Sequence, residues 1–226
     1  MNARWIAAAV LVALVAARPA GAGGEIVYVA LGDSTGVGVG ARAGGGYPQR
    51  LAARLERAGR AVRLVNLSET GATAADLLRH QLDRLAAAQP TLVTLAIGAN
   101  DVGFGRTEAE FAHDLEALGA RLSTLHVPIV AATIPDVSLA PAAAGAAPAL
   151  LDRISRFNAE IRRAAVRYGW RLVDLYQQSR SFLAAGTQRL FSDDGFHPSD
   201  EGYERWADAM LPTLVSALPP ATSRVR

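Results

Sequence analysis

One serine, one aspartate and one histidine in this sequence stand in surroundings that suit acyl transfer. Ser34 lies in the run Gly-Asp-Ser-Thr-Gly at residues 32–36. The glycines there can expose the hydroxyl and let backbone N–H groups approach a substrate oxygen. Asp194 and His197 lie three residues apart, across a glycine and just before an expected helix. That spacing allows the carboxylate to hold one ring nitrogen while the other takes a proton from a serine. Taken singly, the serine also suits a helix cap and the histidine an exposed residue of a capped turn.

Two further runs offer hydrogen-bond donors for an oxyanion. Gly71 lies in Ser-Glu-Thr-Gly-Ala-Thr at residues 68–73, and a glycine lets backbone N–H groups stay open to a ligand. Asn100 lies in Gly-Ala-Asn-Asp at residues 98–101. A side-chain amide there can donate to a developing oxyanion, which contributes about 3 kcal/mol of transition-state stabilisation. An ordinary turn at Gly71 and an Asx turn at Asn100 are the alternatives.

The elements that must position these residues alternate along the chain. Apolar runs predict strands over 26–31, 62–67, 91–97, 128–133 and 171–175, and helical spacing predicts helices over 48–58, 73–85, 107–125, 150–168 and 199–218. Thr73 with Asp76, and Thr107 with Glu110, have the spacing of capping boxes. Near-continuously apolar strands that alternate with helices predict a three-layer, doubly wound α/β sandwich of the flavodoxin-like type, with about five parallel strands. Ligands bind beyond the carboxyl ends of such strands, where all four runs fall.

The four runs follow one another as in the SGNH (GDSL-type) hydrolases, and the chain resembles that family over residues 26 to about 215. The resemblance implies that Ser34 is the nucleophile, His197 the general base and Asp194 its partner. It also implies an oxyanion hole formed by the N–H groups of Ser34 and Gly71 and the amide of Asn100. The family usually has leucine after the serine, where this chain has Thr35. That departure concerns packing and substrate fit, not the nucleophile.

The resemblance implies a serine esterase acting on carboxylic esters or thioesters. Phe104, Phe191 and the Ala- and Pro-rich loop at 138–149 are candidates to line an acyl pocket, although both phenylalanines also suit a core. Compact size and the lack of an evident aromatic platform for sugars favour a lipolytic esterase, thioesterase or lysophospholipase. A carbohydrate acetylesterase of the same family is the alternative.

Two other functional classes compete with this interpretation. The run at residues 32–36 also satisfies Gly-x-Ser-x-Gly, the nucleophile elbow of the α/β-hydrolases. In those enzymes the elbow follows a strand well inside the chain, whereas Ser34 follows the first strand. An exported module that binds a nucleotide or another small ligand is the non-enzyme alternative, but residues 36–40 do not give Gly-x-Gly-x-x-Gly in register.

The first 22 residues have the pattern of a signal peptide. Arg4 precedes an apolar run over residues 5–17, and Ala-Gly-Ala at 20–22 suits a cleavage site. We therefore expect a signal peptide at 1–22, one hydrolase domain at 23–218, a tail at 219–226, and an exported protein, periplasmic or secreted. The run is short for a membrane anchor, which is the alternative, so we expect no stable membrane span after cleavage.

The composition of the chain limits which classes of partner and cofactor it can be expected to bind. Residues 1–22 hold two arginines and no acid, so the remainder carries a formal net charge of zero, against +2 for the whole chain. Basic residues are scattered, which argues against a nucleic-acid partner. The chain has no cysteine, which excludes thiol chemistry and a lipid-anchored cysteine. Its four histidines show no metal-ligand spacing. We expect a small ester or acyl substrate, no cofactor and no required metal.

Overall fold

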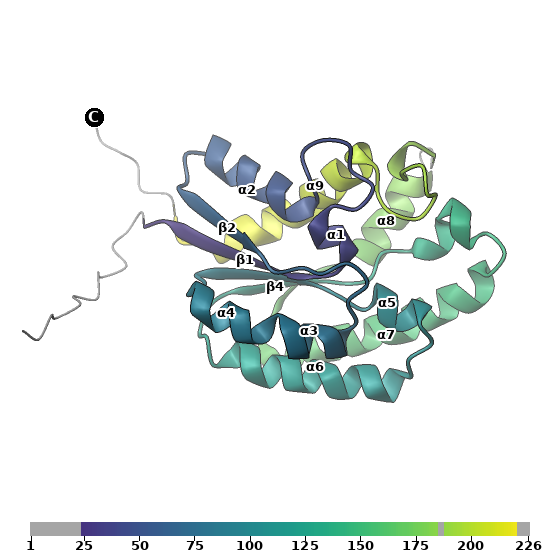
Figure 1. Cartoon of the computed structure of the whole chain (residues 1–226), viewed down its shortest axis with the longest axis horizontal. Helices are drawn as coiled ribbons and strands as arrows, with labels where there is room; N and C mark the ends of the chain where they lie inside the picture. Colours follow the sequence, from purple (N-terminus) through teal and green to yellow (C-terminus); the bar gives the residue numbers. More distant parts are fainter. Residues whose placement is uncertain (1–23, 185–187, 221–226) are drawn as a thin grey trace, which may run out of the picture.

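A parallel five-stranded sheet forms the centre of the molecule (Figure 1). The computed structural model describes residues 24–184 and 188–220. The expected signal peptide at 1–22 and most of the expected tail lie outside these residues. The strand order is β2-β1-β3-β4-β5, with bounds β1 Ile26–Gly32, β2 Val62–Asn66, β3 Leu92–Ala96, β4 Ile129–Ala132 and β5 Arg171–Val173. The predicted doubly wound α/β fold is confirmed, and this order is the flavodoxin-like one.

The central strands are apolar because both of their faces are covered. Every residue of β1, β3 and β4 is buried, as expected for parallel strands between two helical layers. The register pairs Tyr28 of β1 with Leu92 of β3, and Val93 of β3 with Ile129 of β4. The one polar side chain within β3, Thr94, is satisfied by a 2.9 Å hydrogen bond with the Tyr28 hydroxyl.

Two hydrophobic clusters bind the helices to opposite faces of the sheet. One cluster joins the sheet to α2 (Tyr47–Arg57) and α9 (Asp200–Ala217). The other joins it to α3 (Ala74–His80), α4 (Leu82–Ala88), α6 (Glu108–Ser123) and α7 (Ala147–Tyr168). Figure 1 shows these two layers above and below the sheet. The remaining helices are α1 (Ser34–Val37), α5 (Ala99–Gly103), α8 (Leu175–Ala184), and three 3-10 turns, η1 (Val137–Leu139), η2 (Pro141–Ala143) and η3 (Gln188–Leu190).

Besides small shifts in bounds and the short helices α1, α5 and η3, the expected elements differ from the observed ones in three places. Both predicted capping boxes are present, but the single helix expected over 73–85 is two helices, α3 and α4, which meet at Gln81. The loop expected over 138–149 contains η1, η2 and the first turn of α7. Helix α8 was not expected, because β5 was predicted to extend to residue 175, which is the first residue of that helix.

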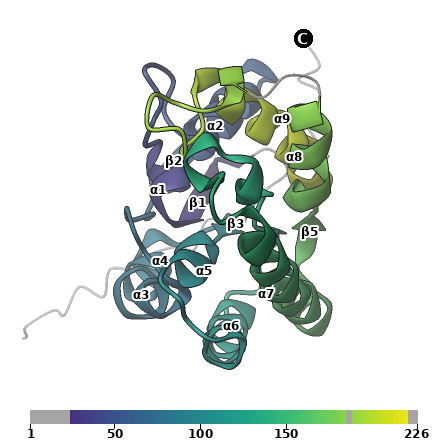
Figure 2. The same ribbon diagram turned by 90° about the vertical axis from the view of Figure 1, so that its right-hand side faces the viewer.

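The short helices of the structure lie at the carboxyl ends of the strands. In Figure 2, which looks onto this end of the sheet, α1, α5 and α8 surround the strand ends. Each of the first four strands is followed here by a loop or short helix, so polar residues far apart in sequence come together. Among the described residues, no helix has both the length and the apolar character to cross a membrane.

Candidate active site

Ser34 is the first residue of α1 and projects from the end of β1. The preceding residue, Asp33, caps α1: its carboxylate accepts from the Thr35 N–H at 2.9 Å and from the Thr35 hydroxyl at 2.8 Å. Thr35, the departure from the family's usual leucine, therefore adds a hydrogen bond to the turn. Ser34 is only 6% exposed, so its hydroxyl sits at the floor of the site and not on an open surface.

His197 and Asp194 approach Ser34 from a segment just before α9. The Nε2 atom of His197 lies 2.9 Å from the Ser34 hydroxyl oxygen, and Nδ1 lies 2.6 Å from a carboxylate oxygen of Asp194. These are hydrogen-bonding distances along the whole chain of three groups. The structure thus brings together the three residues that the spacing singled out, although 163 positions separate Ser34 from His197.

The second carboxylate oxygen of Asp194 holds the segment in shape. It accepts from the backbone N–H groups of Phe196 at 2.8 Å and His197 at 2.9 Å, and from the Ser192 hydroxyl at 2.8 Å. Gly195 takes the left-handed conformation, φ 70°, that this tight turn requires. Partial burial raises the pKa of Asp194, but the bonds from Phe196 and His197 outweigh it and hold that pKa well below its ordinary value. The carboxylate is therefore ionised wherever an imidazole titrates.

The Asp33 carboxylate lies beneath the same site and was not singled out from the sequence. It is 3% exposed. Burial raises its pKa, while the two bonds from Thr35 and the charge of His197 act in the opposite direction. Its place between a strand-end glycine and the serine is the signal that could have identified it.

The candidate oxyanion donors lie on three adjacent strand ends. Within the described residues, the N–H groups of Ser34 and Gly71 have no hydrogen-bond partner in the protein. Gly71 has φ 79°, which favours glycine, and a Cβ there would meet no atom within 4 Å. The Asn100 amide donates to the Ala72 carbonyl at 2.9 Å. This bond joins the segment after β3, which carries Asn100, to the loop after β2, which carries Gly71. An amide has two N–H bonds, so one remains for a ligand.

A buried acid next to Asn100 strengthens the same connection. Asp101 is 0% exposed, and its carboxylate accepts from the Ala74 N–H at the start of α3 at 3.0 Å. Burial raises the pKa of Asp101 to about 6, against the opposing effects of the Ala74 N–H and Arg106. Asn100 and Asp101 thus each bind the loop that contains Gly71, one through Ala72 and one through Ala74.

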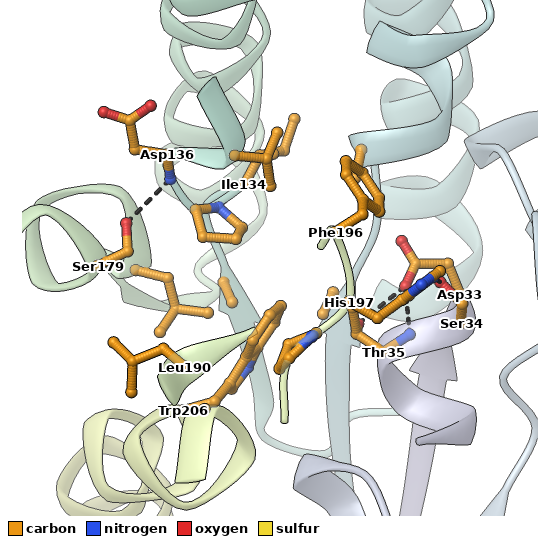
Figure 3. A pocket seen from close by; sticks show the side chains of 18 of the residues that line it. Asp33, Ser34, Thr35, Ile134, Asp136, Ser179, Leu190, Phe196, His197 and Trp206 are labelled. Atoms are coloured by element: carbon orange, nitrogen blue, oxygen red, sulfur yellow. Dashed lines mark hydrogen bonds between the residues drawn. The ribbon is translucent and has the colours of Figure 1, made fainter. Parts of the chain in front are cut away.

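An apolar cavity opens directly beside Ser34 and His197. It is open to solvent and holds about 1000 Å³ of empty space. In Figure 3, Ile134 and Leu190 face Phe196 across this hollow, while the Asp136 carboxylate turns away from it. The lining comes mainly from the ends of β3 and β4 and from α8, η3 and α9, and its apolar members include Ala96, Ile97, Ala132, Ile134, Pro135, Val137, Leu175, Phe182, Leu190, Phe191, Phe196 and Trp206.

Only one of the residues expected to line the pocket does so. Phe191 lines the cavity, whereas Phe104 does not: it ends α5 and its side chain is 68% exposed. The expectation for Phe104 is wrong, because α5 turns that residue outward. None of residues 138–149 lines the cavity either. That segment instead supports the histidine turn, since the Ala142 N–H donates to the Gly195 carbonyl at 3.0 Å.

Most residues of the cavity wall were not predicted from the sequence. Ile134 and Pro135 lie just past β4, after Thr133, so the strand-end rule that located Asn100 could have found them. Phe196 is adjacent to His197 in sequence. Trp206 and Phe182 carry no such signal, because their place depends on how α9 and α8 pack. No group of three or more potential metal ligands gathers within residues 24–184 and 188–220.

Comparison with known proteins gives a consistent result. Residues 30–205 match the model of the GDSL-like lipase/acylhydrolase family. The chain is similar to the crystal structure of TesA, with 25% identity, a TM-score of 0.71, and coverage of 85% of this chain and 99% of that one. It is also similar to LAE5, an alpha/beta hydrolase enzyme from the metagenome of Lake Arreo in Spain (24%, TM-score 0.72, 88% and 98%). A third similar structure is Axe2, an acetylxylan esterase from Geobacillus stearothermophilus (20%, TM-score 0.71, 90% and 99%). No curated protein sequence matches the chain.

Proposed function

Because the chain belongs to the GDSL-like lipase/acylhydrolase family and is a carboxylic ester hydrolase, we propose that it cleaves acyl esters through an acyl intermediate on Ser34. The observation that carries this proposal is the unbroken contact from Asp194 through His197 to Ser34, at 2.6 Å and 2.9 Å, beside an apolar cavity. The family membership argues against the α/β-hydrolase elbow and the ligand-binding module as interpretations of residues 32–40.

The first half of the reaction forms the acyl enzyme. The Ser34 oxygen attacks the ester carbonyl as its proton passes to Nε2 of His197, and the carbonyl electrons move onto oxygen. The N–H groups of Ser34 and Gly71 and the Asn100 amide stabilise that oxyanion. Asp194 holds the ring through Nδ1 and stabilises the imidazolium. Collapse of the intermediate breaks the ester bond, and the leaving alcohol or thiol takes the proton from His197.

The second half releases the acid. Water gives a proton to His197 as its oxygen attacks the acyl carbon, and the second tetrahedral intermediate is held by the same donors. Its collapse breaks the bond to the Ser34 oxygen, which recovers its proton from His197. The carboxylic acid leaves and the site returns to its starting state, so the cycle consumes one ester and one water.

The cavity favours acyl chains as the group bound beside Ser34. Most of its exposed wall is aliphatic and aromatic, with polar side chains such as Thr133, Ser179 and Arg205 among them, and it runs from Ser34 past β3 and β4 to α8. Burial of an apolar chain gains about 0.8 kcal/mol per methylene, so a chain that follows this wall binds more tightly than an acetyl group. We therefore propose a lipolytic type of substrate, a fatty-acyl ester or thioester, over an acetylated sugar.

A series of p-nitrophenyl esters tests both parts of the proposal. Hydrolysis of the acetate, butyrate, octanoate and decanoate esters is measured for the unchanged protein and for Ser34→Ala, with circular dichroism as the check on folding. We expect kcat/KM to rise from acetate toward the longer chains and Ser34→Ala to lose turnover on all of them. A preference for acetate would reject the acyl-chain proposal, and a folded Ser34→Ala variant that still turns over would reject the mechanism.

Export is a separate proposal that depends on residues 1–22. Their short apolar run after Arg4 and the small residues at 20–22 are typical of a cleaved leader. Expression of the full chain in a bacterial host, followed by N-terminal sequencing, is the test. We expect protein that starts at Gly23 in the periplasmic or culture fraction, whereas full-length protein in the membrane fraction would favour the anchor.

A further inference from the structure

A buried glutamine outside the catalytic set holds the strand end from which Ser34 projects. Gln81 lies between α3 and α4 and is 0% exposed. Its side-chain carbonyl accepts from the Gly32 N–H at 3.0 Å, and its amide donates to the Gly32 carbonyl at 2.7 Å. Both groups of one strand residue point to the same side of the strand. The pairing of β1 with β2 ends at Ala30. At Gly32 the Gln81 side chain takes the place of a neighbouring strand, because it bonds both the N–H and the carbonyl of that residue.

The position of Gly32 explains why this pairing bears on catalysis. Gly32 lies two residues before Ser34, and a Cβ on it would lie 2.6 Å from the Ala96 carbonyl oxygen of β3. The backbone is thus pressed against β3 on one side and held by Gln81 on the other. The Gly32 carbonyl also accepts from the Glu69 N–H at 3.1 Å, so the same atom joins β1 to the loop that contains Gly71.

From that carbonyl, hydrogen bonds continue through the other oxyanion donors. The Ala72 N–H donates to the Glu69 carbonyl at 3.1 Å, which closes the turn around Gly71. The Ala72 carbonyl in turn accepts from the Asn100 amide at 2.9 Å. The segments that carry the three donors, Ser34, Gly71 and Asn100, are therefore joined by one network of hydrogen bonds. Gln81 fixes this network at Gly32, close to the proposed nucleophile.

We propose that Gln81 is a positioning residue for the oxyanion hole, an inference that rests on the acyl-transfer function proposed above. Gln81 does not touch the substrate. It sets the peptide planes around Gly32, and through them the spacing between the Ser34 N–H and the Gly71 N–H. Displacement of a catalytic group by about 1 Å can cost on the order of 100-fold in rate, so small movements of Gly32 reach the chemistry.

The fold supplies a matched control at the end of β4. Asn158 on α7 is also 0% exposed, and it binds a single residue in the same way: it accepts from the Ile134 N–H at 2.7 Å and donates to the Ile134 carbonyl at 2.9 Å. Ile134 lines the cavity beyond the end of β4, and although its side chain lies next to Gly98, its backbone takes no part in the network that joins Gly32, Gly71 and Asn100. Equal changes at Gln81 and Asn158 therefore remove equal hydrogen bonds from different parts of the site.

The test compares Gln81→Glu with Asn158→Asp. Each change replaces the amide donor by an oxygen that, when ionised, cannot donate to the facing carbonyl. For Gln81→Glu at pH 8 we expect kcat on p-nitrophenyl butyrate to fall on the order of 10- to 100-fold, less than the roughly 10²–10³-fold loss of a whole oxyanion donor, with KM changed much less. For Asn158→Asp we expect a loss of thermal stability similar to that of Gln81→Glu. Its kinetic effect should differ, however, with KM for p-nitrophenyl octanoate changing more than kcat.

A pH series separates positioning from damage to the core. A protonated carboxylic acid can donate again, so the ratio of kcat for Gln81→Glu to that of the unchanged protein is expected to rise as pH falls from 8 to 5. The groups that titrate or carry charge in the site and on the elements around Gln81 include His197, Asp33, Asp101, Glu69 with its partners His80 and Arg84, Asp76 with Arg79, and Asp83 with Arg121. All of them are shared by the two proteins, so their effects largely cancel in the ratio.

Gln81→Met serves as a second variant that keeps the volume and removes both hydrogen bonds. It is expected to show the same fall in kcat at every pH, and it carries the test if Gln81→Glu does not fold. A folded variant of either kind with wild-type kcat overturns the proposal, as does an equal kcat loss in Asn158→Asp at equal stability. Turnover that persists in Ser34→Ala would instead reject the acyl-serine mechanism, whatever the result at Gln81.

Discussion

Ser34 and His197 are hydrogen-bonded to each other, yet the segments that carry them are held in different ways. Ser34 follows the wholly buried strand β1, and its surroundings are held by residues distant in sequence, such as Gln81, which binds Gly32. His197 lies on a partly exposed turn over residues 191–199, held mostly by its own short-range bonds to Asp194 and by a bridge between Phe191 and Pro198. The segment that carries Ser34, the nucleophile arm, thus depends on the core, whereas the segment that carries His197, the base arm, depends mainly on the Asp194 carboxylate.

This difference gives Asp194 two tasks that can be separated. One oxygen holds the imidazole and the other holds the turn. The segment that carries Ser34 does not depend on one group in this way, because both the Gln81 side chain and the Glu69 N–H bind Gly32, and Asn100 binds the Ala72 carbonyl. Substitutions in the base arm should therefore change catalysis most and the stability of the fold least.

Asp194→Asn should give the largest effect of the predictions that follow. The asparagine keeps an acceptor for the turn but presents an N–H to Nδ1, which favours the wrong ring tautomer, so kcat should fall about 10⁴-fold, with a smaller loss of stability than in Asp194→Ala. Asp194→Ala should lose activity comparably and also lose the bonds to Phe196 and His197. We expect it to be about 1 kcal/mol less stable than Asp194→Asn, at the low end for bonds to charged groups because the side chain is 45% exposed. Kinetics and urea unfolding measure both, and equal stabilities would contradict the dual role.

Asn100→Ala probes the nucleophile arm. Loss of the amide removes one oxyanion donor and the bond to the Ala72 carbonyl, and we expect kcat to fall about 10²–10³-fold. KM should change little, since the donor acts chiefly in the transition state. Steady-state kinetics on the butyrate ester provide the test, with circular dichroism as the folding control. An unchanged kcat would remove Asn100 from the oxyanion hole.

The acid limb of the pH dependence should be set by His197 and not by the buried Asp101, whose pKa is raised to about 6, because Asp101 contacts neither Ser34 nor His197. Only neutral His197 can accept the Ser34 proton, and Asp194 stays ionised because its hydrogen bonds hold its pKa far below its ordinary value. The acid limb of log kcat/KM should therefore have a slope of about one, a tenfold loss per pH unit. The stability that Asp194 contributes should be complete above pH about 4, its unfolded pKa, and lost as pH falls toward the lower folded pKa. A slope of two above pH 5 would show that a second group must also lose a proton.

Arg42→Ala should give the smallest effect. Arg42 donates at 2.8 Å to Asp193, the neighbour of Asp194 in sequence, but the two side chains are 79% and 89% exposed. Solvent screens such a pair, so the turn should keep its shape through Asp194. We expect kcat within about twofold of the unchanged protein at both low and high salt. A large, salt-dependent loss would show that the base arm needs support from the 38–46 loop after α1.

The sequence predicts the parts of the molecule that follow from local pattern. Apolar runs such as residues 26–31 mark buried strands, and Thr73 and Thr107 mark helix starts, because strand burial and helix capping depend on neighbours in the chain. The strand-end rule then places Ser34, Asn100 and the Gly71 loop at one edge of the sheet. The catalytic roles of these residues remain predictions.

What could not be predicted depends on contacts between distant segments. The break at Gln81 arises because its side chain turns inward to Gly32, a partner 49 positions away. Phe104 was a candidate for the pocket wall, but α5 turns it outward. Trp206 enters the cavity wall only because α9 packs with its indole stacked on Tyr47 of α2, ring centres 5.5 Å apart.

Covalent labelling with a fluorophosphonate ester tests the central claim most directly, because the reagent reacts with a serine only where a general base activates it. Intact mass and peptide mapping should show one adduct, on Ser34, that rises in step with the loss of esterase activity. His197→Ala should label far more slowly under the same conditions. Complete inactivation with the adduct on another residue, or an active protein whose Ser34 never reacts, would contradict the account.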